Sequence, residues 1–195
     1  MANDKRKRAV VDKWKKKKQF KLISPKLFGT SEFGETIATK PEQLIGRMIK
    51  LNLGILTNQI RNKNAEAFLR ISKVEGSNAY TDFVGFQIKN SYLRRLFKRK
   101  TSKVELIENW TTKDKLKIKI KFVAVTYGKQ EVSKVKAIRK ELYGFMENFV
   151  KENSIDKILE LCLDSKRLFS PLLPKLKKIS RISATEVEKV KVNYK

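Results

Sequence analysis

The side chains in this sequence with the clearest chemical use are cations, and the chemistry they favour is the binding of a polyanion. The chain of 195 residues has 46 Lys and Arg against 20 Asp and Glu, which gives a formal net charge of +26. Side chains that neutralise phosphates release condensed counterions, and this gives strong, salt-dependent affinity. We therefore expect nucleic acid as the partner, with an acidic membrane surface as the competing polyanion.

The cations that we predict to bind RNA gather in three places, and one further arginine lies in a later predicted helix. The first place is an N-terminal arm, the second is a basic segment around residue 95, and the third is a strand around residue 118. The predicted RNA-binding residues are Lys5, Arg6, Lys7, Arg8, Lys13, Trp14, Lys15, Lys16, Lys17, Lys18, Arg94, Arg95, Lys98, Arg99, Lys100, Lys117, Lys119 and Arg139.

The arm, residues 1–19, has nine cations and only two acids. A like-charge block of this kind does not fold alone and becomes ordered on a partner. We interpret it as an RNA-penetrating extension in which Trp14 stacks on an unpaired base or packs against the body. The alternatives are a solvated tail and a signal of the nuclear-localisation type.

The residue types needed for most catalytic and metal chemistry are missing. The chain has no histidine, and Cys162 is its only cysteine. The commonest general base, the commonest metal ligand, thiolate zinc sites and an internal disulfide are thereby excluded. Neither of the glycine-rich nucleotide-binding motifs occurs. We predict no enzyme activity, no metal or other cofactor and no small-molecule substrate.

Two alternative functions fit the same composition. An RNA-processing enzyme would need a carboxylate cluster, assembled by the fold from acids such as Glu32, Glu35, Asp82 and Asp114, but their spacing does not single them out. A chromatin-like DNA binder would be equally basic. Mg²⁺-dependent turnover of RNA would identify the first, and a preference for duplex DNA over structured RNA would identify the second.

From residue 20 onward, short apolar segments with turn residues between them favour strands. In the clearest one, Leu116, Ile118 and Ile120 alternate with lysines, so one face should be buried and the other should be a row of ammonium groups. Turn chemistry at residues 75–78 predicts a hairpin. The expected strands are Leu44–Leu53, Ala67–Glu75, Ala79–Phe86, Val104–Trp110 and Lys115–Tyr127.

Three segments have helical periodicity. The first, Asn90–Thr101, is a basic helix capped by Asn90 or Ser91 and suited to contact RNA. The second is the long amphipathic helix Val132–Lys151. The third is Ile155–Leu163, with Ser154 as its N-cap.

The C-terminal third differs in charge from the rest of the chain. Residues 130–164 have six basic and seven acidic side chains, so we expect this region to pack on the sheet or face a protein neighbour. Pro171 and Pro174 should break any helix, and Leu176–Val192 is a basic stretch that could supply a last strand or a tail.

Together these elements predict an α+β fold. Its body is an antiparallel β-barrel or sandwich, with a basic helix between strands, amphipathic helices toward the C-terminus and the basic arm at the N-terminus. After the arm, residues 20–195 form one domain: a β body (20–128), a helical part (130–164) and a basic C-terminal segment (165–195). An apolar fraction of 41% is enough for a packed core.

No apolar run approaches the roughly 18 residues that a spanning helix needs. The N-terminus also lacks the apolar part of a signal peptide. These two observations favour a soluble, cytoplasmic protein with no membrane partner.

Short motifs in a fixed order resemble an archaeal and eukaryotic family of small-subunit ribosomal proteins, called eukaryotic-type S-one or S-three-A. Each motif is weak alone, but their order and spacing over about 130 residues are specific. They are Asp12–Lys17, Ser24-Pro25 with Phe28, Phe33–Thr36, Leu44–Arg47, Thr81–Gly85, Tyr92–Arg94, Arg99–Ser102, Thr111–Asp114 and Ala137–Lys140.

The chain departs from the family pattern at several points. Lys89-Asn90-Ser91 replaces the usual T-R-D, Phe86 replaces a histidine, Glu131 and Val132 interrupt a serine-rich run, and Ser170–Leu173 replaces Y-P-L-R-R. The family's contacts in these segments are therefore not carried over.

The resemblance implies a barrel-like body with flanking helices. It also implies a place on the platform of the small subunit, near the mRNA exit and the 3′ end of the small rRNA. The implied partners are this rRNA, neighbouring platform proteins and mRNA near the exit, and the chain length fits the shorter archaeal form.

Overall fold

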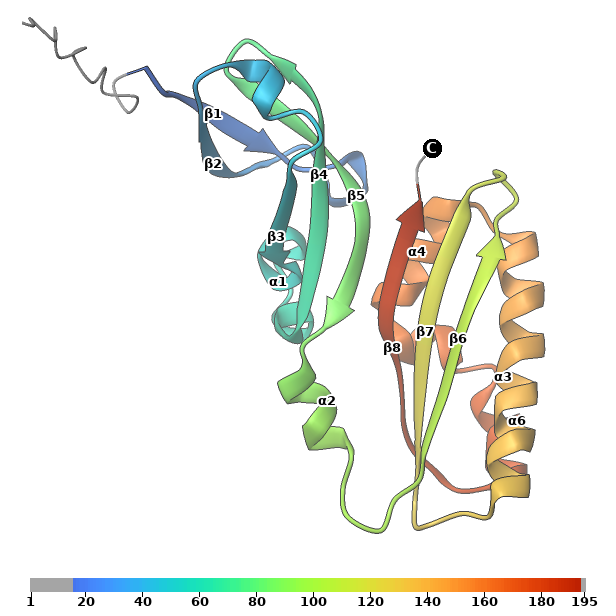
Figure 1. The fold of residues 1–195 in the computed structure, drawn as a ribbon. Coiled ribbons are helices and arrows are strands. Elements are labelled where there is room, and N and C mark those ends of the chain that lie inside the picture. Colours follow the sequence, from blue (N-terminus) through green and yellow to red (C-terminus); the bar gives the residue numbers. More distant parts are fainter. Residues whose placement is uncertain (1–15, 194–195) are drawn as a thin grey trace, which may run out of the picture.

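The computed structural model describes residues 16–193, and this part of the chain is an α+β fold built on one mixed, open sheet (Figure 1). The strands are β1 (Lys18–Ile23), β2 (Glu32–Ala38), β3 (Met48–Asn52), β4 (Ala65–Glu75), β5 (Asn78–Ile88), β6 (Lys103–Thr111), β7 (Lys117–Thr126) and β8 (Ile182–Asn193). The α-helices are α1 (Leu53–Thr57), α2 (Asn90–Leu96), α3 (Val132–Glu152), α4 (Ile155–Leu163), α5 (Ser165–Phe169) and α6 (Leu173–Ile179). Short 3₁₀ turns are η1 (Lys26–Phe28), η2 (Pro41–Gln43) and η3 (Ile60–Asn64).

Strands β1 to β5 make up the N-terminal half, in the order β2-β1-β5-β4-β3. The predicted hairpin at residues 75–78 is confirmed, since β4 and β5 pair antiparallel and Gly76 supplies the positive φ of the turn. No backbone ladder joins β2 to β3 within the described residues. Instead, the Arg47 guanidinium donates to Thr36 Oγ1 at 2.9 Å, which links the two edges through a side chain.

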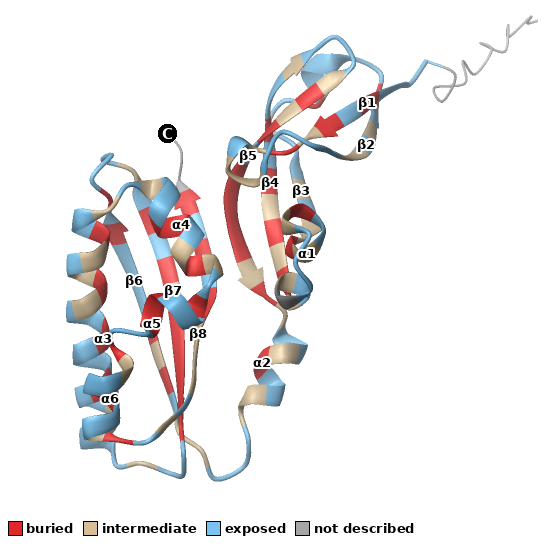
Figure 2. Ribbon diagram, turned by 180° about the vertical axis from the view of Figure 1, so that it is seen from behind, coloured by how far each residue is buried: buried red, intermediate tan, exposed pale blue. Residues whose placement is uncertain are grey.

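Strands β6, β7 and β8 with helices α3 to α6 make up the C-terminal half. The strands form an antiparallel meander, and the helices cover one face of it (Figure 2). Ile118, Ile120 and Phe122 are buried under the helices, as their alternation predicted. Ile138 and Met146 of α3 are fully buried on the same side, so the predicted amphipathic helix is confirmed.

The two halves share one sheet through a short contact between β5 and β8. Three residue pairs form this ladder, Gly85 with Lys191, Phe86 with Val190, and Gln87 with Lys189. A Cβ on Gly85 would lie 2.1 Å from the Val190 carbonyl oxygen. The strands can therefore approach this closely only because residue 85 has no side chain.

The predicted antiparallel barrel or sandwich differs from this sheet in two ways. β1 pairs parallel with β5, so the sheet is mixed, and β2, β3 and β6 keep an unpaired edge among the described strands, so the sheet is open. The reason is that β5 uses one edge for two partners, β1 at residues 78–80 and β8 at residues 85–87. These long-range pairings leave no trace in local periodicity.

The predicted basic helix at Asn90–Thr101 is too long. Helix α2 ends at Leu96, and its N-cap position is Lys89, which has no capping side-chain bond; neither Asn90 nor Ser91 is the cap. Lys98–Lys100 lie in a turn, where Lys100 has φ +62°. Without acids to pair with, the cations do not sustain a further helical turn.

The predictions for the C-terminal segment were partly wrong. Pro171 lies between α5 and α6, whereas Pro174 lies in the first turn of α6, a position that tolerates proline. Helical structure therefore resumes after Pro171. Of the two alternatives for the basic stretch after them, the strand is confirmed as β8. Ser154 occupies the N-cap position of α4 but makes no capping bond.

Candidate nucleic-acid interface

A group of exposed cations without ion-pair partners among residues 16–193 lies on the open face of β7 and β8. We call Lys117, Lys119, Lys189 and Lys191 the lysine face. All four side chains are exposed, because they alternate with residues buried under the helices. The strand register places Lys119 directly opposite Lys191, and Lys189 opposite Lys121.

The acids near the lysine face are engaged elsewhere. Lys121 lies 2.8 Å from Glu188 and 3.3 Å from Glu105, which also pairs with Lys103. Burial lowers the pKa of Lys121, but its hydrogen bonds to Glu188 and Glu105, together with the charges of these two carboxylates, outweigh this and raise the pKa overall. A hydrogen bond from Lys103 lowers the pKa of Glu105. Within residues 16–193 no acid lies within ion-pair distance of the lysine face.

Like charges directly opposite on neighbouring strands destabilise a sheet. Lys119 and Lys191 are such a pair, with no intervening acid within the described part of the chain. This repulsion disappears when a polyanion covers both side chains. The lysine face is therefore suited to phosphate groups, and its four residues include no aromatic ring that could stack on a base.

The second predicted cluster is exposed but divided between two elements. Arg94 and Arg95 lie on α2, and Lys98, Arg99 and Lys100 lie in the turn that follows. The Arg95 guanidinium lies 5.5 Å from the centre of the Tyr92 ring, a cation–π contact. Among the described residues no acid lies within ion-pair distance of any of the five cations.

Arg139 does not belong to the lysine face. Its Nε–H donates to the Glu105 carbonyl oxygen at 3.0 Å, which fastens α3 to strand β6. This contact indicates a structural role. The structure places Lys18 at the start of β1 and Lys16 and Lys17 just before it, all exposed. The other predicted arm residues, Lys5, Arg6, Lys7, Arg8, Lys13, Trp14 and Lys15, lie outside the described residues.

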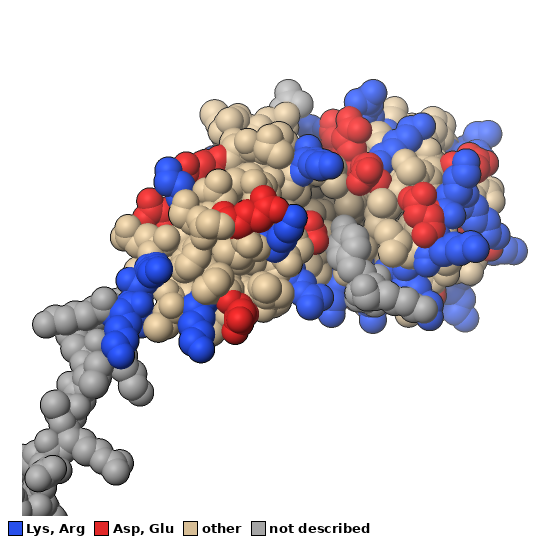
Figure 3. Space-filling model, turned by 90° about the horizontal axis from the view of Figure 1, so that it is seen from above, with Lys and Arg blue, Asp and Glu red and all other residues tan. Residues whose placement is uncertain are grey.

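Sequence reasoning missed the half of the lysine face that lies on β8. The signal was present, since Lys189, Val190, Lys191 and Val192 alternate as the residues of β7 do. Only the register of β8 beside β7 brings the two rows together. Seen from above, Lys and Arg occur on both halves of the molecule, with Asp and Glu among them (Figure 3).

Of the four carboxylates considered for catalysis, Glu32, Glu35, Asp82 and Asp114, two make contacts that stabilise the fold. Glu32 pairs with Lys21 at 3.1 Å, and Asp114 Oδ2 accepts a hydrogen bond from the Ile155 N–H at 2.9 Å. Residues 16–193 contain no group of three or more Cys, Asp or Glu side chains that could hold a metal ion.

None of the helices within residues 16–193 has both the length and the apolar character needed to cross a membrane.

A basic surface such as the lysine face is typical of proteins that contact polyanions. The model of the ribosomal S3Ae family matches residues 5–195. A curated relative from Archaeoglobus fulgidus, small ribosomal subunit protein eS1, is 34% identical over 194 residues, covering 98% of this chain and 92% of the relative. Its namesake from Methanopyrus kandleri is 36% identical over 154 residues, covering 79% of this chain and 73% of that relative. The chain belongs to the ribosomal S3Ae family, as its motifs predicted.

Proposed function

We propose that this protein is a structural, non-catalytic component of the small ribosomal subunit and that it binds rRNA through its lysine face. Family membership supports the ribosomal role, since the relatives are named as small-subunit proteins. The observation that supports the RNA contact is the position of Lys119 directly opposite Lys191 on an open sheet face. Among the described residues, no free acid lies near these two lysines. The proposed location is the ribosome in the cytoplasm.

The proposed mechanism is positional. Lysine contacts to phosphates fix the orientation of a protein on RNA without reading its sequence. Lys117 and Lys119 on β7 and the two lysines of β8 form a rigid array, because the ladder and the helices beneath hold the strands in place. Arg94, Arg95 and the turn Lys98–Lys100 supply a second contact, and the basic arm, residues 1–19, supplies a third.

The finer assignment follows from the resemblance of the motifs. We infer a place on the platform, near the mRNA exit and the 3′ end of the small rRNA, with platform proteins as neighbours and mRNA passing nearby. In this proposal residues 20–195 act as one unit, and the arm extends from it into RNA.

The decisive experiment removes the lysine face. The variant has Lys117, Lys119, Lys189 and Lys191 replaced by Gln. Its slope of log affinity against log salt for structured rRNA should become shallower by about 0.7–0.9 for each phosphate that is no longer neutralised, about 3 for all four lysines. A filter-binding or fluorescence titration at several salt concentrations measures this slope.

The matched control removes four exposed lysines from the helix-covered side. These are Lys134, Lys136, Lys140 and Lys157, on α3 and α4. Both variants have the same net charge, so a difference between them reports the position of the lysines. We expect the control, whose lysines lie away from the proposed RNA contact, to change the slope by less than about 1. Equal changes in the two variants would show that net charge alone binds RNA and that the sheet face has no special part.

A further inference from the structure

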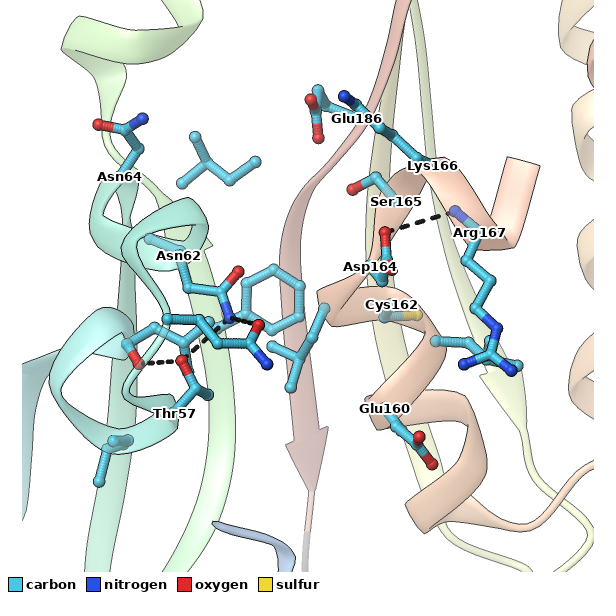
Figure 4. Close-up of a pocket in the computed structure, with 18 of the residues that line it drawn as sticks. Thr57, Asn62, Asn64, Glu160, Cys162, Asp164, Ser165, Lys166, Arg167 and Glu186 are labelled. Carbon is cyan, nitrogen blue, oxygen red and sulfur yellow. Dashed lines mark hydrogen bonds between the residues drawn. The ribbon is translucent and has the colours of Figure 1, made fainter. Parts of the chain in front are cut away.

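A cleft of about 820 Å³ lies between the N-terminal half and helices α4 and α5 (Figure 4). It opens where β5 and β8 separate, beyond their short ladder at Gly85–Gln87. On one side is the segment from α1 to η3, and on the other are residues 160–167. Tyr92 closes part of the gap, because its hydroxyl donates to Glu186 Oε1 at 3.3 Å. We call this hollow the central cleft.

The floor and one wall of the central cleft can recognise a peptide. The floor is apolar, with buried Leu53, Leu56 and Phe86 among its residues. The α1–η3 wall has amide side chains, which offer donors and acceptors to a peptide backbone. Asn62 is one of these, and its amide is held by a hydrogen bond to Thr57 Oγ1 at 3.0 Å. Apolar pockets with a few fixed polar groups are typical binding sites.

The charge of the central cleft is opposite to that of the molecule. Three carboxylates line it, from Glu160, Asp164 and Glu186, against two cations, Lys166 and Arg167. In the whole chain the cations outnumber the acids by 46 to 20. Arg167 also extends away from the α1–η3 wall, whereas Glu186 and Lys166 lie close together (Figure 4). The cleft therefore disfavours phosphates and favours cations.

The carboxyl group of Glu186 lies in the cleft, and its neighbours stabilise its charged form only in part. Burial raises its pKa, and the hydrogen bonds from Ser165 and Tyr92 and the charge of Lys166 only partly oppose this. A cation entering the cleft would compensate the carboxylate. Charge-assisted hydrogen bonds of this kind are roughly twice as strong as neutral ones.

The segment that forms the α1–η3 wall also has an exposed apolar residue. Ile60 is 81% exposed and lies in η3 between Gln59 and Asn62, which both line the hollow. An apolar group of this size beside a polar rim is typical of protein interfaces and adds nothing to phosphate binding.

From these observations we propose that the central cleft is the docking site for an extended cationic segment of a protein neighbour. Lys or Arg side chains of that segment contact Glu160 and Glu186, and an apolar side chain of the segment packs on the floor. This inference deepens the proposed function, since it presumes a neighbour within the subunit. RNA is the disfavoured occupant because the three carboxylates of the cleft outnumber its two cations.

The test uses the full chain and two fluorescent probes. One is a synthetic twelve-residue peptide of alternating Lys and Leu, and the other is a twelve-nucleotide oligouridine. The double variant Glu160→Lys, Glu186→Gln should lower the affinity for the peptide at least about tenfold. Glu42→Lys combined with Glu35→Gln changes the charge equally at exposed positions outside the cleft and should leave the affinity within about twofold.

Three outcomes would overturn the proposal. They are peptide binding that the cleft variant leaves unchanged, an equal loss of affinity in the control variant, and oligouridine that competes with the peptide for the cleft. The lysine-face variant separates this test from the proposed function. Its loss of salt-dependent RNA binding should leave peptide affinity intact, so either proposal can fail while the other stands.

Discussion

At the scale of single residues, Gly85 controls the contact between the two halves. A Cβ at this position would lie 2.1 Å from the Val190 carbonyl oxygen and 3.0 Å from Lys191 Cα, and both are backbone atoms of β8 that cannot rotate away. Gly85→Ala must therefore separate β5 from β8. We expect the free energy of unfolding to fall by about 3 kcal/mol or more, measured by urea denaturation.

Gly34 provides the matched control for this substitution. It also lies in a strand, β2, but a Cβ there has no atom within 4 Å. Gly34→Ala should change the free energy of unfolding by less than about 0.5 kcal/mol. A similar small effect of Gly85→Ala would mean that the β5–β8 ladder contributes little to stability.

Glu186 should make the stability depend on pH. Burial raises the pKa of its carboxyl above the ordinary value near 4.5, so the folded state binds the proton more tightly than the unfolded state does. Its contribution to stability is greatest below the ordinary pKa and declines as the pH rises through the raised pKa. Glu186→Gln should therefore be more stable than the parent at neutral pH, and the difference should vanish below pH 4.5.

Thermal unfolding of both proteins between about pH 4 and pH 8 measures this difference. Other carboxyls titrate in the same range, but they contribute equally to the two proteins and cancel. A constant difference across the whole range would show that the substitution acts through packing and that the charge of Glu186 is unimportant.

At the scale of elements, helix α4 begins with a cap supplied by a distant turn. Asp114 follows β6, and its Oδ2 accepts the Ile155 N–H at 2.9 Å across 41 positions of sequence. A carboxylate there also compensates the positive end of the helix dipole. Asp114→Ala should lower the free energy of unfolding by about 1 kcal/mol, measured by chemical denaturation.

Ser154→Ala is the informative comparison for Asp114. Ser154 occupies the N-cap position, but its side chain makes no capping bond. Its replacement should cost less than about 0.5 kcal/mol. The opposite order of the two effects would mean that the serine is the true cap. Asp114 is also the last residue of the Thr111–Asp114 motif, and this contact gives the motif a physical role.

Local patterns predicted the elements of this fold but not their partners. The alternation in β7 and the three- and four-residue spacing in α3 depend on neighbours in sequence, so both could be predicted. The parallel pairing of β1 with β5 depends on segments about 57 residues apart, as with Lys21 and Asn78, and no period encodes it. The same limit hid the lysine face, because its second row comes from β8 near the end of the chain.

The basic segment after residue 90 shows a different limit. Its apolar spacing fitted a helix as far as Phe97, but a tertiary contact of Phe97 acts together with the repulsion between the cations in ending α2. Phe97 has extended backbone angles, and its ring lies 4.5 Å from Lys103 Nζ at the start of β6. Local propensity is a weak prior that such contacts override.

At the scale of the whole molecule, the charge of +26 means that the isolated protein repels itself. The described residues contain only seven close ion pairs. Most of the cations in this part of the chain therefore find compensation mainly from solvent ions or from a partner. A ligand that binds the folded state alone raises stability in proportion to the logarithm of its concentration.

This argument leads to a final prediction about polyanions. Structured RNA should raise the unfolding temperature by several degrees more than sodium chloride does at equal ionic strength, because a polyanion bridges neighbouring lysines whereas single ions only screen them. The gain should shrink markedly in the variant with Lys117, Lys119, Lys189 and Lys191 replaced by Gln, and only slightly in the helix-side control. Differential scanning calorimetry measures these shifts. If the salt and the RNA gave equal shifts, screening would account for the stabilisation, and the register of β7 and β8 would have no role in holding a polyphosphate chain.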